Sequence, residues 1–244
     1  MLSISNDAKT IKGLKYGFLT GILYLTPADK SGRNVCAMAD IAGCKIPCLA
    51  MAGRGAFSSV QIARLSKTDW YFNDREGFML ELVDSVRALI RKAIREDLTP
   101  LVRLNGTSDI LFEKIAITYK GITYQNIMAL FPEVQFYDYT KIPGRKVPKN
   151  YDLTFSYSGA IAYQKYVQQA IDNKMRIAVV FRTVADIPKT FLGLKVIPGD
   201  NSDIRHVEQK NRIVALYAKG PAKYDTGPFV VDTLKRVIQI KLAA

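Results

Sequence analysis

The sequence has little of what the common hydrolases need. It contains one histidine, His206, among 244 residues, and it has no Gly-x-Ser-x-Gly motif. A serine or cysteine nucleophile depends on a neighbouring base, most often histidine, and this motif exposes the serine in one large class of these enzymes. The sequence therefore argues against a metal-free hydrolase.

Long apolar runs are also absent. A helix needs about 20 apolar residues to cross a bilayer, and the stretch at residues 16–27 is shorter and is interrupted by glycine and threonine. The first 12 residues carry polar and charged side chains, where a secretory signal would need an apolar segment. We therefore expect a cytoplasmic protein that makes no contact with a membrane.

No stretch rich in proline, glycine and serine divides the chain, and no internal repeat or low-complexity segment is present. With 48% hydrophobic and 23% charged residues, the composition is that of a globular protein with enough apolar surface for a sizeable core. Single α/β domains often reach this length. We expect one α/β domain over residues 1–244, with a cysteine-bearing loop at residues 28–55.

Acidic residues are in deficit. The sequence has 22 aspartates and glutamates against 35 lysines and arginines, which gives a formal net charge of +13. A positive excess raises the local concentration of anionic partners, so nucleic acid or a nucleotide is the expected partner. The basic residues are spread along the chain, however, and many proteins are basic without such a partner. The charge leaves the substrate open, and nothing in the sequence indicates an oligomeric state.

Apolar periodicity predicts alternating strands and helices. Residues 79–95 place apolar side chains at helical spacing with basic residues between them, which is typical of an amphipathic helix. The run 21–27, which ends in a proline, is expected to be a buried first strand. Further strands are expected at 101–104, 134–137, 153–155, 177–181, 195–197 and 213–217, and helical stretches at 124–130 and 159–173. This alternation favours βαβ units, in which reactive groups gather at the carboxyl ends of parallel strands.

Three cysteines, Cys36, Cys44 and Cys48, follow the first expected strand with seven and then three residues between them. Three thiols cannot all pair in disulfides, and a close group in a reducing compartment more often binds metal or performs redox chemistry. Three thiolates can ligate three irons of a [4Fe-4S] cluster and leave the fourth iron open. A structural zinc site would need a fourth ligand, which could be His206 from a distant part of the sequence. Cysteines that bind no metal are the remaining alternative.

Polar side chains follow the second expected strand. Its exit carries Arg103, Asn105 and Asp109, and strand alternation predicts that Arg103 and Asn105 share one face. A turn in which Asp109 caps a helix would account for part of this pattern. It would not explain an arginine and an asparagine within a strand, where burial without a partner is costly.

The next strands also end in polar groups. The third expected strand leads into FYDYTK at residues 136–141, where the period of two puts Tyr137 and Tyr139 on one face and Asp138 on the other. Ser156 ends the fourth. Because several strands deliver polar side chains at the same end, we expect a shared rim that faces a ligand.

A cysteine loop directly after a first strand, followed by strand–helix units, resembles the plan of the radical S-adenosylmethionine (radical SAM) enzymes. In that superfamily three cysteines on the first loop bind a [4Fe-4S] cluster, and S-adenosylmethionine occupies the open iron. The resemblance implies a partial (β/α)6 TIM-like barrel with parallel strands. The usual pattern of the superfamily has three and then two residues between the cysteines, whereas this chain has seven and then three.

A closer resemblance is to an uncharacterised protein family of phages and plasmids. It rests on the segments 34–48, 52–55 (AGRG), 103–110 (RLNGTSDI), 136–141 (FYDYTK) and 153–156 (LTFS). Membership implies a mobile-element setting, with the protein in the cytoplasm of a host cell, and little about mechanism.

The leading hypothesis is an iron–sulfur-dependent, radical-SAM-like enzyme that acts on a nucleic acid or nucleotide. The resemblance implies a [4Fe-4S] cluster held by Cys36, Cys44 and Cys48, with S-adenosylmethionine as a further cofactor. The expected catalytic residues are Tyr137, Asp138 and Lys141. The residues expected to bind cofactor or substrate are Gly53, Gly55, Arg103, Asn105, Asp109 and Ser156. The two glycines would let the backbone approach the cofactor closely.

The alternative hypothesis is a non-catalytic, basic nucleic-acid-binding protein with a structural metal site. The metal would only staple the cysteine loop, and basic residues such as Arg145, Lys146 and Lys149 would neutralise phosphates. Lys219, after the last strand, could lie over the rim and neutralise an anion under either hypothesis. A phosphate binder loses affinity steeply as salt rises, whereas an enzyme should lose activity when Cys44 is replaced.

Overall fold

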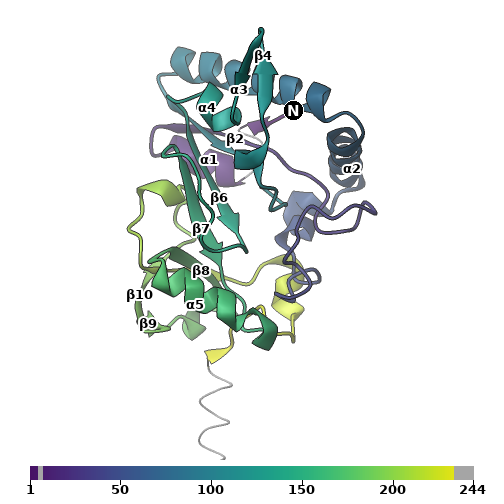
Figure 1. Ribbon diagram of the computed structural model, residues 1–244. Coiled ribbons are helices and arrows are strands. Elements are labelled where there is room, and N and C mark those ends of the chain that lie inside the picture. The colour runs from purple at the N-terminus through teal and green to yellow at the C-terminus, as the bar shows by residue number, and fades with distance from the viewer. Residues whose placement is uncertain (5–7, 234–244) are drawn as a thin grey trace, which may run out of the picture.

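The centre of the fold is a nine-stranded sheet, seen in the computed structural model of Figure 1, which describes residues 1–4 and 8–233. Its strands lie in the order β1-β2-β3-β6-β7-β8-β11-β10-β9. They are β1 (Ser3–Ile4), β2 (Phe18–Ile22), β3 (Thr99–Arg103), β6 (Gln135–Thr140), β7 (Tyr151–Ser156), β8 (Arg176–Phe181), β9 (Thr190–Phe191), β10 (Leu194–Pro198) and β11 (Ile213–Tyr217). A separate antiparallel hairpin pairs β4 (Ile117–Tyr119) with β5 (Ile122–Tyr124).

The strands between the two edges of this sheet are parallel, and the edge strands β1 and β9 run antiparallel to their neighbours. From β2 to β8 the neighbours follow the chain order, and β11 then lies between β8 and β10. The expected α/β class with a mostly parallel sheet is confirmed. The described sheet is open, because β1 and β9 do not pair with each other, so it forms no closed barrel.

The helices are α1 (Ala8–Leu14), α2 (Ser58–Asn73), α3 (Arg75–Arg95), α4 (Ile127–Leu130) and α5 (Gln164–Asp172). The amphipathic helix predicted at 79–95 is confirmed as α3, which begins after Asp74, whose side chain accepts a hydrogen bond from the Gly77 amide and caps the helix. The stretch 159–173 forms a 3-10 turn and α5, whereas 124–130 yields only the four residues of α4.

One expectation about the strands needs correction. The first strand of the parallel set is Phe18–Ile22 and not 21–27, because its partner β3 ends at Arg103. The Leu23 amide makes the last bond of this ladder, to the Arg103 carbonyl at 2.8 Å. The connection from β6 to β7 contains no helix in the structure, although the strands are parallel. Its ends are held by other means: the Asn150 side chain donates to the carbonyls of Met128, Phe131 and Val134.

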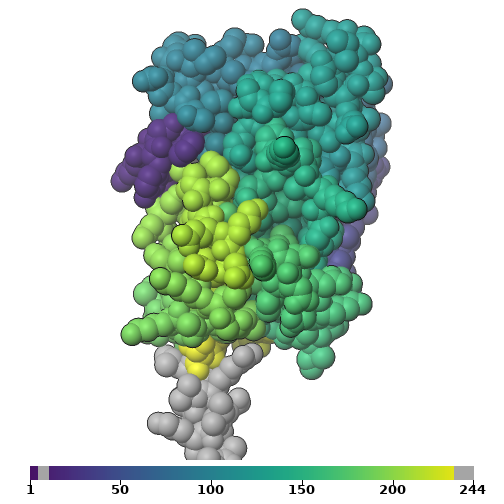
Figure 2. All heavy atoms as spheres, turned by 60° about the vertical axis from the view of Figure 1, so that its left-hand side comes forward, coloured from purple at the N-terminus to yellow at the C-terminus, as the bar shows by residue number. Residues whose placement is uncertain are grey.

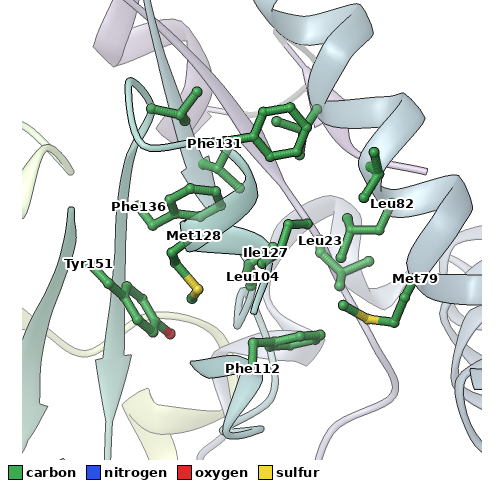
Figure 3. Packing of buried hydrophobic residues seen from close by; sticks show 14 of the residues in the cluster. Leu23, Met79, Leu82, Leu104, Phe112, Ile127, Met128, Phe131, Phe136 and Tyr151 are labelled. Atoms are coloured by element: carbon green, nitrogen blue, oxygen red, sulfur yellow. The ribbon is translucent and has the colours of Figure 1, made fainter. Parts of the chain in front are cut away.

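One face of the sheet is apolar and is covered by α3 and α5 (Figure 1). Leu82, Val86 and Leu89 of α3 pack with buried side chains of β2, β3, β6 and β7, and part of this core, with Phe112 and Met128, is seen in Figure 3. A second cluster places α5 on β7, β8 and β11. Burial of such apolar surface is the main driving force for this packing.

The opposite face of the sheet is unusually polar for buried surface. Arg103 and Arg176 project from it, and Arg205 covers it from the β10–β11 connection; all three are fully buried. Buried charges persist only where partners satisfy them, and here Arg176 bonds to Asp152 at 2.7 Å. The same connection packs Ile204 against Leu101 and Tyr137.

The β10–β11 connection thus covers the polar face of the sheet.

The described part of the chain contains no helix that is both long enough and apolar enough to cross a membrane.

Candidate functional site

A cavity of about 320 Å³ opens at the carboxyl ends of the parallel strands. We call it the central cavity. It is lined by the last residues of β3, β6, β7 and β11, by β8, and by the cysteine loop. Eight of the predicted site residues line it: Cys36, Cys44, Cys48, Arg103, Asn105, Asp109, Lys141 and Ser156. Tyr137, Asp138, Gly53 and Gly55 are outside its lining.

The cysteine loop crosses the cavity from the first strand to the C-terminal part of the chain. It is tied down through its backbone: the carbonyl of Val35 accepts from the Asp109 amide at 2.8 Å, and that of Ala42 from the Ser158 hydroxyl at 2.6 Å. In Figure 1 this dark blue loop faces the yellow segment near residue 220. Gly43 lies against Pro228 there.

All three cysteines are free thiols and half-buried. The sulfur of Cys36 lies 3.8 Å from the carbonyl oxygen of Thr107, and that of Cys44 lies 3.7 Å from the carbonyl oxygen of Ala39. Burial raises the pKa of Cys36 to about 12 and also raises the pKa of Cys44. Cys36 and Cys44 are therefore protonated at neutral pH unless a metal supplies the charge that stabilises thiolates.

The structure shows no ready-made metal site. Among residues 1–4 and 8–233, no group of three or more His, Cys, Asp or Glu side chains could hold a metal ion. His206, suggested as a fourth zinc ligand, is not near the cysteines: it packs on Phe18 and Tyr137 and is outside the cavity lining. In a [4Fe-4S] cluster each thiolate binds a different iron, so its ligands surround a cube and do not converge on one point.

Arg103, the last residue of β3, forms the wall of the cavity. Its Nη1 atom lies 2.6 Å from Asp203 Oδ2, and the hydroxyl of Tyr139 donates to the other oxygen of Asp203 at 3.2 Å. The guanidinium lies 5.5 Å from the Tyr137 ring centre and 5.1 Å from that of Tyr139. The predicted common face of the two tyrosines is confirmed. Arg103 is thus a buried, paired cation.

Asp138 is completely buried and braces the exit of β3. Its carboxylate accepts hydrogen bonds from the amides of Leu104 and Asn105 at 3.0 and 3.1 Å and from the Tyr151 hydroxyl at 3.0 Å. Its Oδ1 atom lies 3.6 Å from Arg103 Nε. Burial raises the pKa of Asp138 to about 6 in spite of these partners.

Asn105 and Asp109 shape the loop that borders the cavity. The predicted common face of Arg103 and Asn105 is not observed, because β3 ends at Arg103 and Asn105 lies beyond it. The Asn105 side chain instead bonds to the Tyr151 hydroxyl and to the backbone of Ile110. Asp109 accepts from the Lys141 amide at 2.7 Å, and burial raises its pKa. Hydrogen bonds to neighbouring backbone and side-chain groups therefore occupy most of the polar atoms of both side chains.

Arg145 is not available for phosphate, contrary to the binding-protein hypothesis. Its side chain is 3% exposed and forms a two-point pair with Glu113, at 3.0 and 2.6 Å, and a further bond of 2.9 Å to Asp109. Lys146 and Lys149 remain exposed on the same connection. A carboxylate fork of this kind fixes a loop, so Arg145 holds the β6–β7 connection against the rim.

Lys141 and Ser156 offer polar atoms to the cavity. The Lys141 ammonium donates at 3.0 Å to the carbonyls of Ser156 and Tyr157 and lies 4.6 Å from the Phe229 ring centre. Burial lowers its pKa to about 8. An ammonium has three donors, so one remains for a ligand once these two bonds are made. The Ser156 hydroxyl makes no hydrogen bond with any described residue.

The two glycines of the cysteine loop have a local explanation. Gly53 has φ +54°, a conformation that glycine adopts without strain. A Cβ on Gly55 would lie 2.4 Å from the Ala50 carbonyl oxygen. Both glycines are therefore required by the turn itself, and their predicted contact with a cofactor stays a prediction.

The sequence did not point to Lys12 or to the pairing of Asp200. Lys12 of α1 and Lys219 both line the cavity, and both donate to Asp200, Lys12 to its backbone carbonyl and Lys219 to its carboxylate. Figure 2 shows the purple N-terminal segment beside the yellow-green segment that contains Asp200. The expected position of Lys219 at the rim is confirmed. Lys12 carried no signal, because its partner is 188 residues away.

The central cavity therefore combines three thiols with a hydroxyl, a buried ammonium and two lysines at one side. The cations of such a site can hold the oxygen atoms of a ligand.

A comparison with protein families gives one match, the family described as gene product 88 (GP88), over residues 1–232. No curated protein and no solved structure matches the chain significantly. The family match includes the cysteine loop and every strand of the sheet. The chain belongs to the gene product 88 family.

Proposed function

We propose that the chain is an iron–sulfur enzyme of the radical SAM type that acts on a nucleic acid or nucleotide. One observation carries the proposal: all three cysteines of the chain line the same cavity as the polar ends of four parallel strands. Cavities at this end of parallel strands are where α/β enzymes place their chemistry.

The donor set supports a cluster with one open iron. The cavity has three thiols, and each can bind one iron, so the fourth iron would be free to take a ligand. A bound [4Fe-4S] cluster would supply one-electron chemistry at this position. It would also supply the charge that these thiols, whose pKa values are raised at Cys36 and Cys44, need to ionise.

The order of strands in the sheet supports a partial TIM-like barrel. The strands β2, β3, β6, β7 and β8 are parallel neighbours in chain order, with helices on one face. That arrangement is what a partial TIM-like barrel would require. The cysteine loop follows β2, the first strand of this set.

The predicted site residues fall into groups according to which of their polar atoms are not already bonded within the protein. Cys36, Cys44 and Cys48 would hold the cluster. Lys141 and Ser156 would bind oxygen atoms of S-adenosylmethionine or of the substrate, since both line the cavity and have donors to offer. Five of the remaining predicted residues have their polar atoms largely bonded and would position these groups: Arg103, Asn105, Asp109, Tyr137 and Asp138. Gly53 and Gly55 would shape the cysteine loop.

The positive charge of the chain supports an anionic partner. The chain carries a net charge of +13, and Lys12 and Lys219 line the cavity. An anionic substrate would be attracted to this side of the molecule. A nucleic acid or nucleotide in a host cell, as expected of a mobile-element protein, has that charge.

The test is an analysis of iron, sulfide and zinc, with a visible absorption spectrum, after anaerobic purification. We expect about four irons and four sulfides per chain. The Cys36/Cys44/Cys48→Ala triple variant should lose them. Ile46→Ser is the matched control, because Ile46 lies between two of the cysteines and is 84% exposed, and it should keep the cluster.

Zinc in place of iron would contradict the enzyme proposal and favour the binding-protein hypothesis. No metal in a protein that was reconstituted with iron and sulfide would overturn both metal assignments. If the cluster is present, equilibrium dialysis with S-adenosylmethionine checks the second half of the proposal, and binding should fall in Lys141→Met.

A further inference from the structure

A second hollow lies far from the cysteines, between helix α3 and the β4–β5 hairpin. We call it the hairpin groove. Its volume is about 550 Å³, and it shares no lining residue with the central cavity. Its lining includes Arg87, Arg91, Tyr119, Lys120, Ile122 and Tyr124. Figure 1 shows β4 rising beside α3 at one end of the molecule.

The hairpin turns its apolar face toward the helix. In the antiparallel pair, Tyr119 lies opposite Ile122, and Thr118 opposite Thr123. Tyr119 and Ile122 line the groove, whereas the two threonine hydroxyls bond to each other at 3.0 Å on the other face. Ile122 is nevertheless 58% exposed. The helix thus covers this face of the hairpin only in part.

The groove is also basic. Arg87 donates to the Tyr119 hydroxyl, and its guanidinium lies 5.2 Å from the Tyr119 ring centre. Lys120 lies 5.7 Å from the same ring centre. Arg91 is exposed and makes no hydrogen bond or ion pair with any described residue. Against these three cations the lining contains a single acid, Glu133.

We propose that the hairpin groove binds a short segment of single-stranded nucleic acid. The cations would contact phosphates, and the apolar side chains and Tyr124 would contact bases. A basic groove combined with aromatic and apolar side chains is how proteins bind single strands without sequence preference. A duplex would offer the phosphates but keep its base faces stacked, so it would leave the apolar lining empty.

This site does not depend on a metal cluster. It would hold a nucleic acid on the outer side of the sheet, next to α3, whatever the cavity does. Its failure and the failure of the cluster proposal are therefore separate results: the Cys36/Cys44/Cys48→Ala triple variant should bind the oligonucleotide as the parent does.

The test is fluorescence anisotropy with a 5′-labelled oligothymidylate of about 20 nucleotides, titrated at several salt concentrations. The Arg91→Ala/Lys120→Ala double variant should bind at least about tenfold more weakly at low salt. Its slope of log K against log salt should be shallower by about 1.4, because each phosphate of a single strand that a cation neutralises adds about 0.7 to that slope. The matched control is Lys165→Ala/Lys195→Ala, which removes the same charge from exposed positions on α5 and β10.

Three outcomes would overturn the proposal. The groove variant could bind as the control variant does. A duplex of the same length could bind as tightly as the single strand. The parent could bind anionic phosphatidylserine vesicles but no oligonucleotide. Since both replaced side chains are exposed, the fold should survive, and Ile122→Asp gives a second variant that places a negative charge in the groove and should weaken binding.

Discussion

Two regions border the central cavity, and they are built in opposite ways. The strand exits at residues 103–109 and 137–141 hold their polar groups in contact with one another, as Asp138 does with two amides and the Tyr151 hydroxyl. In the cysteine loop, the thiols of Cys36 and Cys44 make only long hydrogen-bond contacts, of 3.8 and 3.7 Å, and the thiol of Cys48 makes no hydrogen bond with any described residue. We call the strand exits at residues 103–109 and 137–141 the frame of the cavity. The cysteine loop carries the side chains, the thiols, that the protein itself leaves largely unbonded.

This difference teaches how to read polar motifs. Both segments attract notice in the sequence because they concentrate reactive side chains. In the structure, Asp109 and Arg145 satisfy each other and the rim backbone. A buried polar group that is already bonded contributes to the fold, while a free one can act on a ligand. The sequence motifs therefore mix two roles that only the contacts separate.

The largest effect should come from breaking the frame at Asp138. Asp138→Ala would leave two amides and the Tyr151 hydroxyl without their acceptor in a fully buried place, and would remove one carboxylate from the neighbourhood of Arg103. We expect the free energy of unfolding to fall by about 3–5 kcal/mol, measured by urea denaturation. Asp40→Ala is the control, because the Asp40 side chain is 69% exposed, and it should change stability by less than about 0.5 kcal/mol. A loss below about 1 kcal/mol for Asp138→Ala would show that the brace is not needed.

Lys141 tests the boundary between the two regions, because it belongs to the frame but has a donor to offer the cavity. Its folded-state pKa is about 8, below the 10.5 of the unfolded chain, because of burial. Between these values the unfolded chain binds the proton and the folded protein does not, so the free energy of unfolding rises with pH. From pH 8 to pH 10 we expect a rise of about 2 kcal/mol.

The measurement compares the free energies of unfolding of two chains across this pH range. Both carry alanine at Cys36, Cys44 and Cys48, so that thiol titration does not overlap, and one also carries Lys141→Met. The rise with pH should be confined to the chain that keeps the lysine. Parallel pH profiles for the two chains would mean that Lys141 is hydrated and keeps its ordinary pKa.

Much of the frame could be predicted from local patterns. The spacing of apolar residues identified α3, and apolar runs identified β3, β6, β7, β8, β10 and β11 with shifts of a few residues. The short strands β4, β5 and β9 were not predicted. The grouping of Arg103, Lys141 and Ser156 at one cavity followed from a general property of parallel strands. These signals reside in neighbouring residues, so one sequence is enough to carry them.

The pairings within the frame could not be predicted in this way. Arg103 meets Asp203 across 100 residues of sequence, and Arg145 meets Glu113 across 32. No periodicity marks such partners, since they are chosen by the order of strands and by the course of the β10–β11 connection. Because their partners are distant in the sequence, the sequence did not reveal the position of Lys12 at the cavity, and Arg145 was interpreted as a surface cation.

The smallest effects should come from the cysteine loop. Cys36 packs at the edge of the main core, and a free cysteine there behaves as a small apolar side chain. Cys36→Ala should lower the free energy of unfolding by about 1 kcal/mol, and Cys48→Ala by less than about 0.5 kcal/mol, in urea denaturation of the metal-free protein. If a cluster is bound, the same replacements should cost much more in the loaded protein, because ligand binding to the folded state alone adds to its stability. A large loss already in the metal-free protein would instead mean that the thiols belong to the frame, and the contrast between the two regions would fail.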